Sequence, residues 1–183
     1  MKFAEFLNEI KETNAGAGDF GYDIIEGRQY EFEQFKEDGK KVGNIKGQPI
    51  YMKKESGGMA FAVLDEESEV VDFISRISVD EEIDDIQGYS QSGVWKNKDV
   101  NFKATDIILD IILKEVKLLV SDRYLTRDGK KMWINIFKTK GNDHKCGVFI
   151  NKTEECIYFR NNNLDEILDL AYYDKNNQFF IFD

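Results

Sequence analysis

The fold is constrained most by four consecutive segments: GYSQSGVWK (88–96), ATDIILDIILK (104–114), KLLV (117–120) and RDGKKMWINIFK (127–138). The first segment has the composition of a strand, and KLLV has that of a buried strand. The second segment predicts a helix with a broad apolar face, which is typical of a helix packed on a sheet. Four isoleucines define that face: Ile107, Ile108, Ile111 and Ile112.

The fourth segment predicts another helix, over Arg127–Lys138, with Thr126 as its N-terminal cap. Trp133, Ile136 and Phe137 are expected on its buried side. The remaining predicted elements are a hairpin of residues 146–150 and 156–160, a helix over 164–172 and a strand over 178–182.

A helix that joins two strands of one sheet usually makes them parallel neighbours through a right-handed crossover. The strands expected before residue 88 are separated by short turns and are therefore antiparallel. The sequence thus predicts an α+β fold, a twisted and mixed but mostly antiparallel sheet with helices on both faces. Residues 1–55, an N-terminal helix and a β-meander, are expected to join the core of residues 56–183 in one domain.

The N-terminal half is expected to hold a helix over Phe3–Lys11 and strands over residues 29–36, 42–46, 50–54, 59–64 and 70–78. Asp38-Gly39 is a hairpin turn signal between the first two of these strands. Asp80–Asp85 is a run of charges, which we interpret as a solvated loop or the start of a helix. It lacks the residue order of a calcium loop, so no metal is expected there.

Composition excludes a disordered chain, because 42% of the 183 residues are apolar and 13% are aromatic. The formal net charge of −10 disfavours direct nucleic-acid binding, since phosphates repel an acidic surface. No membrane span or signal peptide is expected, and two cysteines with one histidine cannot form a closed zinc site. These features predict a cytoplasmic protein without a metal.

The order of elements resembles the GNAT-type acyltransferase fold over about residues 59–159. Residues 59–65 and 70–74 resemble its central hairpin, 88–96 its fourth strand, 104–114 its cofactor-side helix and 117–120 its fifth strand. The run of Ser121-Asp122 followed by Thr126, Gly129 and Trp133 is similar to a divergent, phage-associated group of this superfamily. The resemblance implies a phage or mobile-element protein that uses acetyl-coenzyme A to acylate an amine acceptor.

The segment that matches the family's pyrophosphate loop is KDVNFKAT (98–105), and it contains no glycine. Glycines in such loops let backbone N–H groups approach phosphate oxygens. In this chain lysine side chains would replace that contact by charge, and Ala104 would take a small-residue position. The cofactor residues that the resemblance implies are Val94, Trp95, Lys96, Lys98, Lys103 and Ala104.

Amine acylation requires a base for the amine and an acid for the departing thiolate. The resemblance makes Tyr124 the candidate proton donor, because the family often uses a tyrosine near its last helix. Asp72, on a central strand, is the candidate base. Trp95 and Trp133 also fit an ordinary core.

Two other interpretations remain open from the sequence. The chain could be a non-catalytic acidic protein on the same scaffold, whose carboxylates between Asp65 and Asp85 bind a basic host protein, for example as an inhibitor that imitates DNA. It could also be an α+β domain with no relation to acyltransferases. Binding of acetyl-coenzyme A discriminates the enzyme from the inhibitor.

Overall fold

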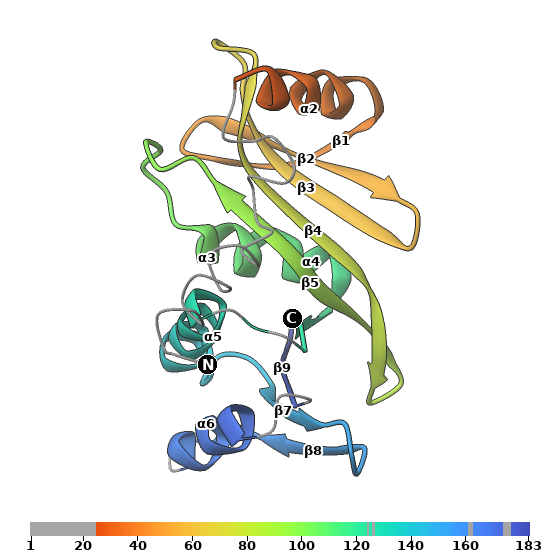
Figure 1. Cartoon of the computed structure of the whole chain (residues 1–183), viewed down its shortest axis with the longest axis vertical. Helices are drawn as coiled ribbons and strands as arrows, with labels where there is room; N and C mark the ends of the chain where they lie inside the picture. The colour runs from red at the N-terminus through yellow and green to blue at the C-terminus, as the bar shows by residue number, and fades with distance from the viewer. Residues whose placement is uncertain (1–24, 124, 126, 161–162, 174–176) are drawn as a thin grey trace, which may run out of the picture. The chain divides into compact units, whose positions relative to one another are not determined.

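The computed structural model describes residues 25–123, 125, 127–160, 163–173 and 177–183. Their strands form a nine-stranded sheet in the order β1-β2-β3-β4-β5-β6-β9-β7-β8 (Figure 1). The strands are β1 (Lys40–Ile45), β2 (Gln48–Glu55), β3 (Gly58–Asp65), β4 (Val70–Ile83), β5 (Ile86–Lys96), β6 (Leu118–Ser121), β7 (Cys146–Ile150), β8 (Glu155–Tyr158) and β9 (Gln178–Phe182). The helical elements are α2 (Ile25–Asp38), α3 (Ala104–Ile107), η2 (Ile108–Ile112), α4 (Leu113–Val116), α5 (Arg127–Lys140) and α6 (Leu164–Tyr173).

The sheet is mixed and mostly antiparallel, as the sequence predicted. β5 and β6 are parallel, with Tyr89 opposite Leu119 and Gln91 opposite Ser121. β9 lies between β6 and β7 and is antiparallel to both. This parallel β5–β6 pair confirms the pairing that was expected from the strand–helix–strand order. The expected helix over Phe3–Lys11 lies outside the described residues.

The described residues divide into two compact units. Unit 1 comprises residues up to Glu55 together with Met59–Arg76 and Gly93–Phe102. Unit 2 comprises Ser56–Gly58, Ile77–Ser92 and residues from Lys103 to the C-terminus. β4 and β5 contribute residues to both units, while α2, β1 and β2 lie in unit 1.

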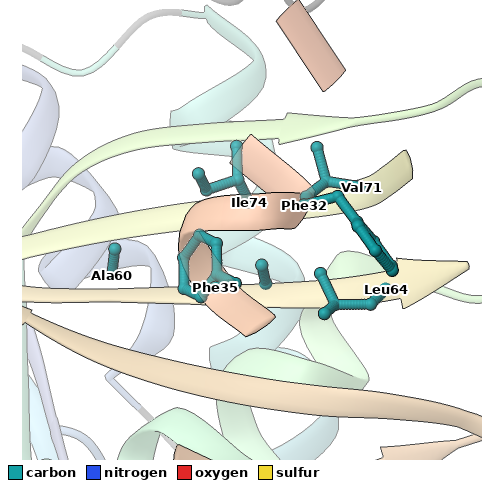
Figure 2. Close-up of a cluster of buried hydrophobic side chains, with 7 residues drawn as sticks. Phe32, Phe35, Ala60, Leu64, Val71 and Ile74 are labelled. Carbon is teal, nitrogen blue, oxygen red and sulfur yellow. The ribbon is translucent and has the colours of Figure 1, made fainter. Parts of the chain in front are cut away.

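The core of unit 1 forms where α2 covers strands β3 and β4 (Figure 2). Phe32 and Phe35 are the buried residues of the helix, and they pack on small side chains of β3, among them Ala60 and Ala62. Burying a phenylalanine contributes about 1.5–3 kcal/mol to stability. The cluster consists of Phe32, Phe35, Ala60, Ala62, Leu64, Val71 and Ile74.

The predicted strand over residues 29–36 is wrong, because this segment is the middle of α2. The alternation of Tyr30 and Phe32 suggested one face of a strand, but residues two apart lie on nearly opposite sides of a helix. Tyr30 is accordingly exposed while Phe32 is buried. Gly39 does not form the expected hairpin turn. Its N–H donates to the carbonyl of Phe35 at 3.0 Å and ends the helix.

In unit 2, α5 packs its predicted apolar side on β9. Trp133 stacks on Phe179 with ring centroids 5.9 Å apart, and Phe137 lies 5.2 Å from the same ring. The buried positions expected for this helix, Trp133, Ile136 and Phe137, are confirmed. The opposite face of β9 carries Phe180 and Phe182, which belong to a separate cluster with β6 and β7.

The helical crossover between β5 and β6 runs from Ala104 to Val116 and has a π-helical turn, η2, at its centre. A π-turn forms i→i+5 hydrogen bonds, so residues five apart face the same side. Ile107 and Ile112 are therefore both fully buried, as are Ile108 and Leu113. Ile111, expected on the buried face of a regular helix, is only half-buried.

The acidic run Asp80–Asp85 is neither a loop nor the start of a helix, which corrects that interpretation. β4 continues through this run to Ile83, and Asp84-Asp85 forms the turn into β5. Ile83 explains the extension, because its side chain is buried in the cluster of Phe180 and Phe182. The charged residues that flank Ile83 remain at the surface. With only one apolar residue among them, the sequence pattern of this strand resembles that of a solvated loop.

Candidate functional site

The Asp72 carboxylate is the centre of a polar network in unit 1. Its Oδ1 accepts hydrogen bonds from Arg28 Nη2 at 2.7 Å and from Asn97 Nδ2 at 2.9 Å. Its Oδ2 accepts a hydrogen bond from Gln48 Nε2 at 2.8 Å. Three elements of unit 1, namely α2, β2 and the loop after β5, are thus tied to one residue of β4.

The charged partners in this network are removed from water. The Asp72 side chain is 6% exposed and the Arg28 side chain 17% exposed. Arg28 Nε also donates to the carbonyl of Val71 at 2.9 Å, and its guanidinium lies 5.6 Å from the ring centre of Trp95. A buried ion pair with this many partners is costly to break, because either charge alone would be left without compensation.

The loop after β5 is held by Asn97. Its backbone N–H donates to the carbonyl of Asp72 at 2.8 Å, and its Oδ1 accepts from the N–H of Asp99 at 3.1 Å. Lys96 Nζ donates to the carbonyl of Val100 at 3.1 Å and lies 5.6 Å from the ring centre of Phe102. The loop therefore has a defined backbone path, although it contains no glycine.

The structure brings together part of the predicted site. Asp72, Trp95 and Lys96 lie in unit 1, where the first two share contact with Arg28. Val94 and Lys98 also belong to unit 1, and both are exposed. Lys103 and Ala104, at the start of α3, belong to unit 2. Tyr124 and the capping residue Thr126 lie outside the described residues.

Asp72 and the lysines have different chemical capabilities here. A general base needs an oxygen that can reach the proton it accepts. Both oxygens of Asp72 already accept hydrogen bonds from protein donors, which suits a positioning role for this carboxylate. Lys96 is engaged with its own loop, whereas Lys98 is an exposed cation on the loop and can meet an anionic ligand.

Arg28, Gln48 and Asn97 complete the network, and the sequence alone did not reveal them. Asn97 carried a weak signal, because an asparagine directly after a strand often shapes a turn with its side chain. Arg28 carried none, because it directly precedes the segment 29–36, which the sequence predicted as a strand. Gln48 lies 24 positions from Asp72 along the chain and is brought to it by the sheet.

The thiols of unit 2 are poor nucleophiles. Burial raises the pKa of Cys146 to about 12. Burial is also the largest cause of the raised pKa of Cys156, which lies on β8 beside Tyr158. Because the thiolate is the reactive form, neither cysteine is suited to covalent catalysis near neutral pH.

Within the described ranges, no group of three or more His, Cys, Asp or Glu side chains is placed to hold a metal ion. None of the helices in those ranges is both long and apolar enough to cross a membrane. The comparisons with protein-family models, curated proteins and solved structures return no match for this chain.

Proposed function

We propose that this chain is a GNAT-like protein that binds an acyl-coenzyme A and transfers the acyl group to an amine. The observation that carries the proposal is the parallel pairing of β5 with β6 across the helical segment 104–116. In the family that the sequence resembles, the corresponding strands and helix border the cofactor. A similarity of fold does not by itself establish an activity, so the proposal also needs a site.

The loop of residues 97–102 supplies that site in unit 1. Asp72 and Asn97 give the loop a fixed path, and Lys98 projects from it as an exposed cation. The family's glycines bring backbone N–H groups to the pyrophosphate, whereas here the Lys98 ammonium takes part of that role by charge. A charged hydrogen bond to a phosphate is stronger than a neutral one, so one lysine can offset the loss of a backbone contact.

The transfer step is ordinary aminolysis of a thioester. The amine nitrogen attacks the thioester carbonyl, the C–N bond forms, and the C–S bond breaks. The amine nitrogen releases one proton to solvent water, and the leaving thiolate takes up one from Tyr124, which solvent then reprotonates. In this proposal Tyr124 donates the proton to the thiolate, and Asp72 acts as a positioning residue for the cofactor loop rather than as the base.

Isothermal titration with acetyl-coenzyme A tests the proposal directly. We expect a dissociation constant between about 1 µM and 1 mM for the wild-type chain. Lys98→Glu is expected to weaken binding by at least about ten-fold, because it replaces a charged hydrogen bond with a repulsion. Lys40→Glu, which makes the same charge change on exposed β1, is the matched control and should change the constant by less than about two-fold.

Each result has a definite meaning. Absence of binding at about 1 mM acetyl-coenzyme A would overturn the acyltransferase function. Equal weakening by Lys98→Glu and Lys40→Glu would show that the loop is not the cofactor site. If binding is found, release of free thiol from acetyl-coenzyme A in the presence of primary amines measures the transfer step.

A second candidate is non-catalytic binding of a basic host protein. It is favoured by Glu82 and Asp85, exposed carboxylates near the end of the β4–β5 hairpin that make no hydrogen bond or ion pair with other described residues. Asp85 has a positive φ of 61°, as expected for a residue of a two-residue hairpin turn, and this conformation holds it at the tip of the hairpin.

An arginine-rich peptide, followed by fluorescence anisotropy at low salt, tests this second candidate. Glu82→Gln with Asp85→Asn should weaken its binding, while Glu67→Gln with Glu69→Gln, an equal charge change in the β3–β4 turn, should have a smaller effect. If the two double variants weakened peptide binding equally, net charge alone would explain the binding, and a specific acidic site would be excluded.

A further inference from the structure

We infer that the end of the β4–β5 hairpin is an ionic latch, which closes over an apolar face of unit 2 and opens when its charge contacts are neutralised. The latch consists of residues 79–86. The face beneath it, called here the aromatic face, is formed by β6, β7, β8 and β9. Its side chains are Leu118, Val120, Phe149, Cys156, Tyr158, Phe180 and Phe182.

Ile83 is the apolar contact between the latch and the aromatic face. It is 2% exposed and clusters with Phe180 and Phe182, although it lies only one residue before the turn. Its neighbours Glu82 and Asp84 are exposed. A single inward residue flanked by surface charges is a small hydrophobic contact area for a hairpin end, so the polar contacts contribute much of its attachment.

Three carboxylates hold the latch, and their polar contacts reach four side chains of unit 2. Asp80 Oδ2 accepts from Gln178 Nε2 on β9 at 3.1 Å. Glu81 Oε1 pairs with Arg123 Nη2, which follows β6, at 2.9 Å. Asp84 Oδ2 accepts from Tyr158 on β8 at 2.6 Å and from Lys145, which precedes β7.

Lys145 connects the latch to the rings themselves. Its Nζ lies 4.8 Å from the ring centre of Tyr158 and 5.1 Å from that of Phe182, while it pairs with Asp84. Two further titratable side chains lie beside this contact: Cys156, which interacts with both Asp84 and Tyr158, and His144, whose Nδ1 lies 3.0 Å from the carbonyl oxygen of Phe182. The loss of the Asp84 charge would therefore remove the anchor that keeps Lys145 over the two rings.

Solvent reaches these contacts, which is why the latch can release. The side chains of Asp84 and Lys145 are 41% and 55% exposed, and those of Glu81 and Arg123 are 50% and 46% exposed. Exposed ion pairs are weak and are screened by salt. The buried Arg28–Asp72 pair of unit 1 provides the contrast, because solvent hardly reaches it.

Hydrogen exchange of the full-length chain tests the latch, with the adjacent aspartate as the control. Asp84→Asn and Asp85→Asn make the same change at neighbouring turn positions that both have positive φ, and asparagine tolerates this conformation. We expect Asp84→Asn to accelerate exchange of the backbone amides of residues 79–88 by about five-fold or more. Asp85→Asn should leave their rates within about two-fold.

Salt dependence provides the second measurement. In the wild-type chain, exchange of the same amides should accelerate on going from low to high salt, and this acceleration should be reduced in Asp84→Asn. The inference is overturned if the two variants exchange alike. It is equally overturned if these amides exchange only through global unfolding, since a latch must open while the rest of unit 2 remains folded.

Discussion

Arg28 on α2 and Asp72 on β4 form a 2.7 Å ion pair. One helical turn later the charges are reversed: Glu31 on α2 pairs with Arg76 on β4 at 2.9 Å. The helix thus presents a positive and then a negative side chain to a strand that presents a negative and then a positive one. If α2 were docked in the reverse direction, like charges would face each other. The pair of ion pairs therefore disfavours the reverse orientation in addition to stabilising the observed one.

Asp72→Ala should destabilise the protein strongly. It leaves the Arg28 guanidinium buried without a carboxylate, and breaking such a pair costs about 3–5 kcal/mol. Asp99→Ala removes an exposed carboxylate of unit 1 and should change the free energy of unfolding by less than about 0.5 kcal/mol. Urea denaturation monitored by circular dichroism measures both. Similar urea midpoints for the two variants would show that the polar network around Asp72 does not stabilise unit 1.

Asn97→Ala tests whether the backbone path of the 97–102 loop contributes to acetyl-coenzyme A binding separately from the charge of Lys98. The substitution removes the side-chain bond to Asp72 and the acceptor for the N–H of Asp99, with an expected loss of about 1–3 kcal/mol. If the loop positions an acyl-coenzyme A, titration at a temperature where the variant is folded should also show weaker acetyl-coenzyme A binding. Unchanged binding in a folded Asn97→Ala protein would show that the loop path does not matter for the ligand.

The contribution of Asp84 to stability should depend on pH in one direction. Hydrogen bonds from Lys145 and then Tyr158 hold the pKa of Asp84 below its ordinary value of 3.8. A carboxylate whose pKa is lowered on folding stabilises the native state fully above that ordinary value, and its contribution is lost as pH falls through the lower folded pKa. The difference in urea midpoint between wild type and Asp84→Asn should therefore be constant from about pH 5 to 7. It should become smaller below about pH 4, where the Asp84 carboxylate is protonated.

Asp85→Asn serves as the control in the same titration. No hydrogen bond or ion pair links Asp85 to other described residues, so its variant should follow the wild-type profile across the acidic range. A pH-independent difference for Asp84→Asn would mean that its contacts with Lys145 and Tyr158 do not stabilise the fold.

Gly147→Ala should disrupt the pairing of β7 with β8. A Cβ atom at this position would lie 2.1 Å from the carbonyl oxygen of Ile157, so the backbones would have to move apart. We expect a loss of about 2–4 kcal/mol in the free energy of unfolding. Gly93→Ala on β5 is the matched control, because a Cβ there meets no atom within 4 Å and the change should be neutral or slightly stabilising. Thermal unfolding of both variants decides the point.

The spacing of apolar residues predicted an element correctly wherever all of its apolar side chains face the same buried surface. The alternation from strand to helix to strand between Gly88 and Val120 predicted the parallel β5–β6 pair, because chirality leaves few ways to connect such strands. The apolar side of α5 was predicted correctly for a similar reason, since Trp133, Ile136 and Phe137 recur at helical spacing. Only the π-turn η2 altered the detail, by moving Ile111 partly out of the core.

Periodicity failed where few residues point inward. α2 buries only Phe32 and Phe35 among its described side chains, so a short alternation near Tyr30 outweighed the helical spacing. The end of β4 buries Ile83 within an acidic run, and its strand character depends on the cluster of Phe180 and Phe182. In both segments the decisive apolar contact is with residues far away in the sequence.

Local spacing and chain chirality were enough to predict the α+β class, the parallel pairing of β5 with β6 and the buried side of α5. The tertiary structure alone decided the network around Asp72, since Arg28 and Gln48 lie 44 and 24 positions away from it. It likewise decided the contact of Asp84 with Tyr158, 74 positions apart. A hydrogen bond requires atoms to meet within about 3 Å, and only the assembled sheet brings such distant positions together.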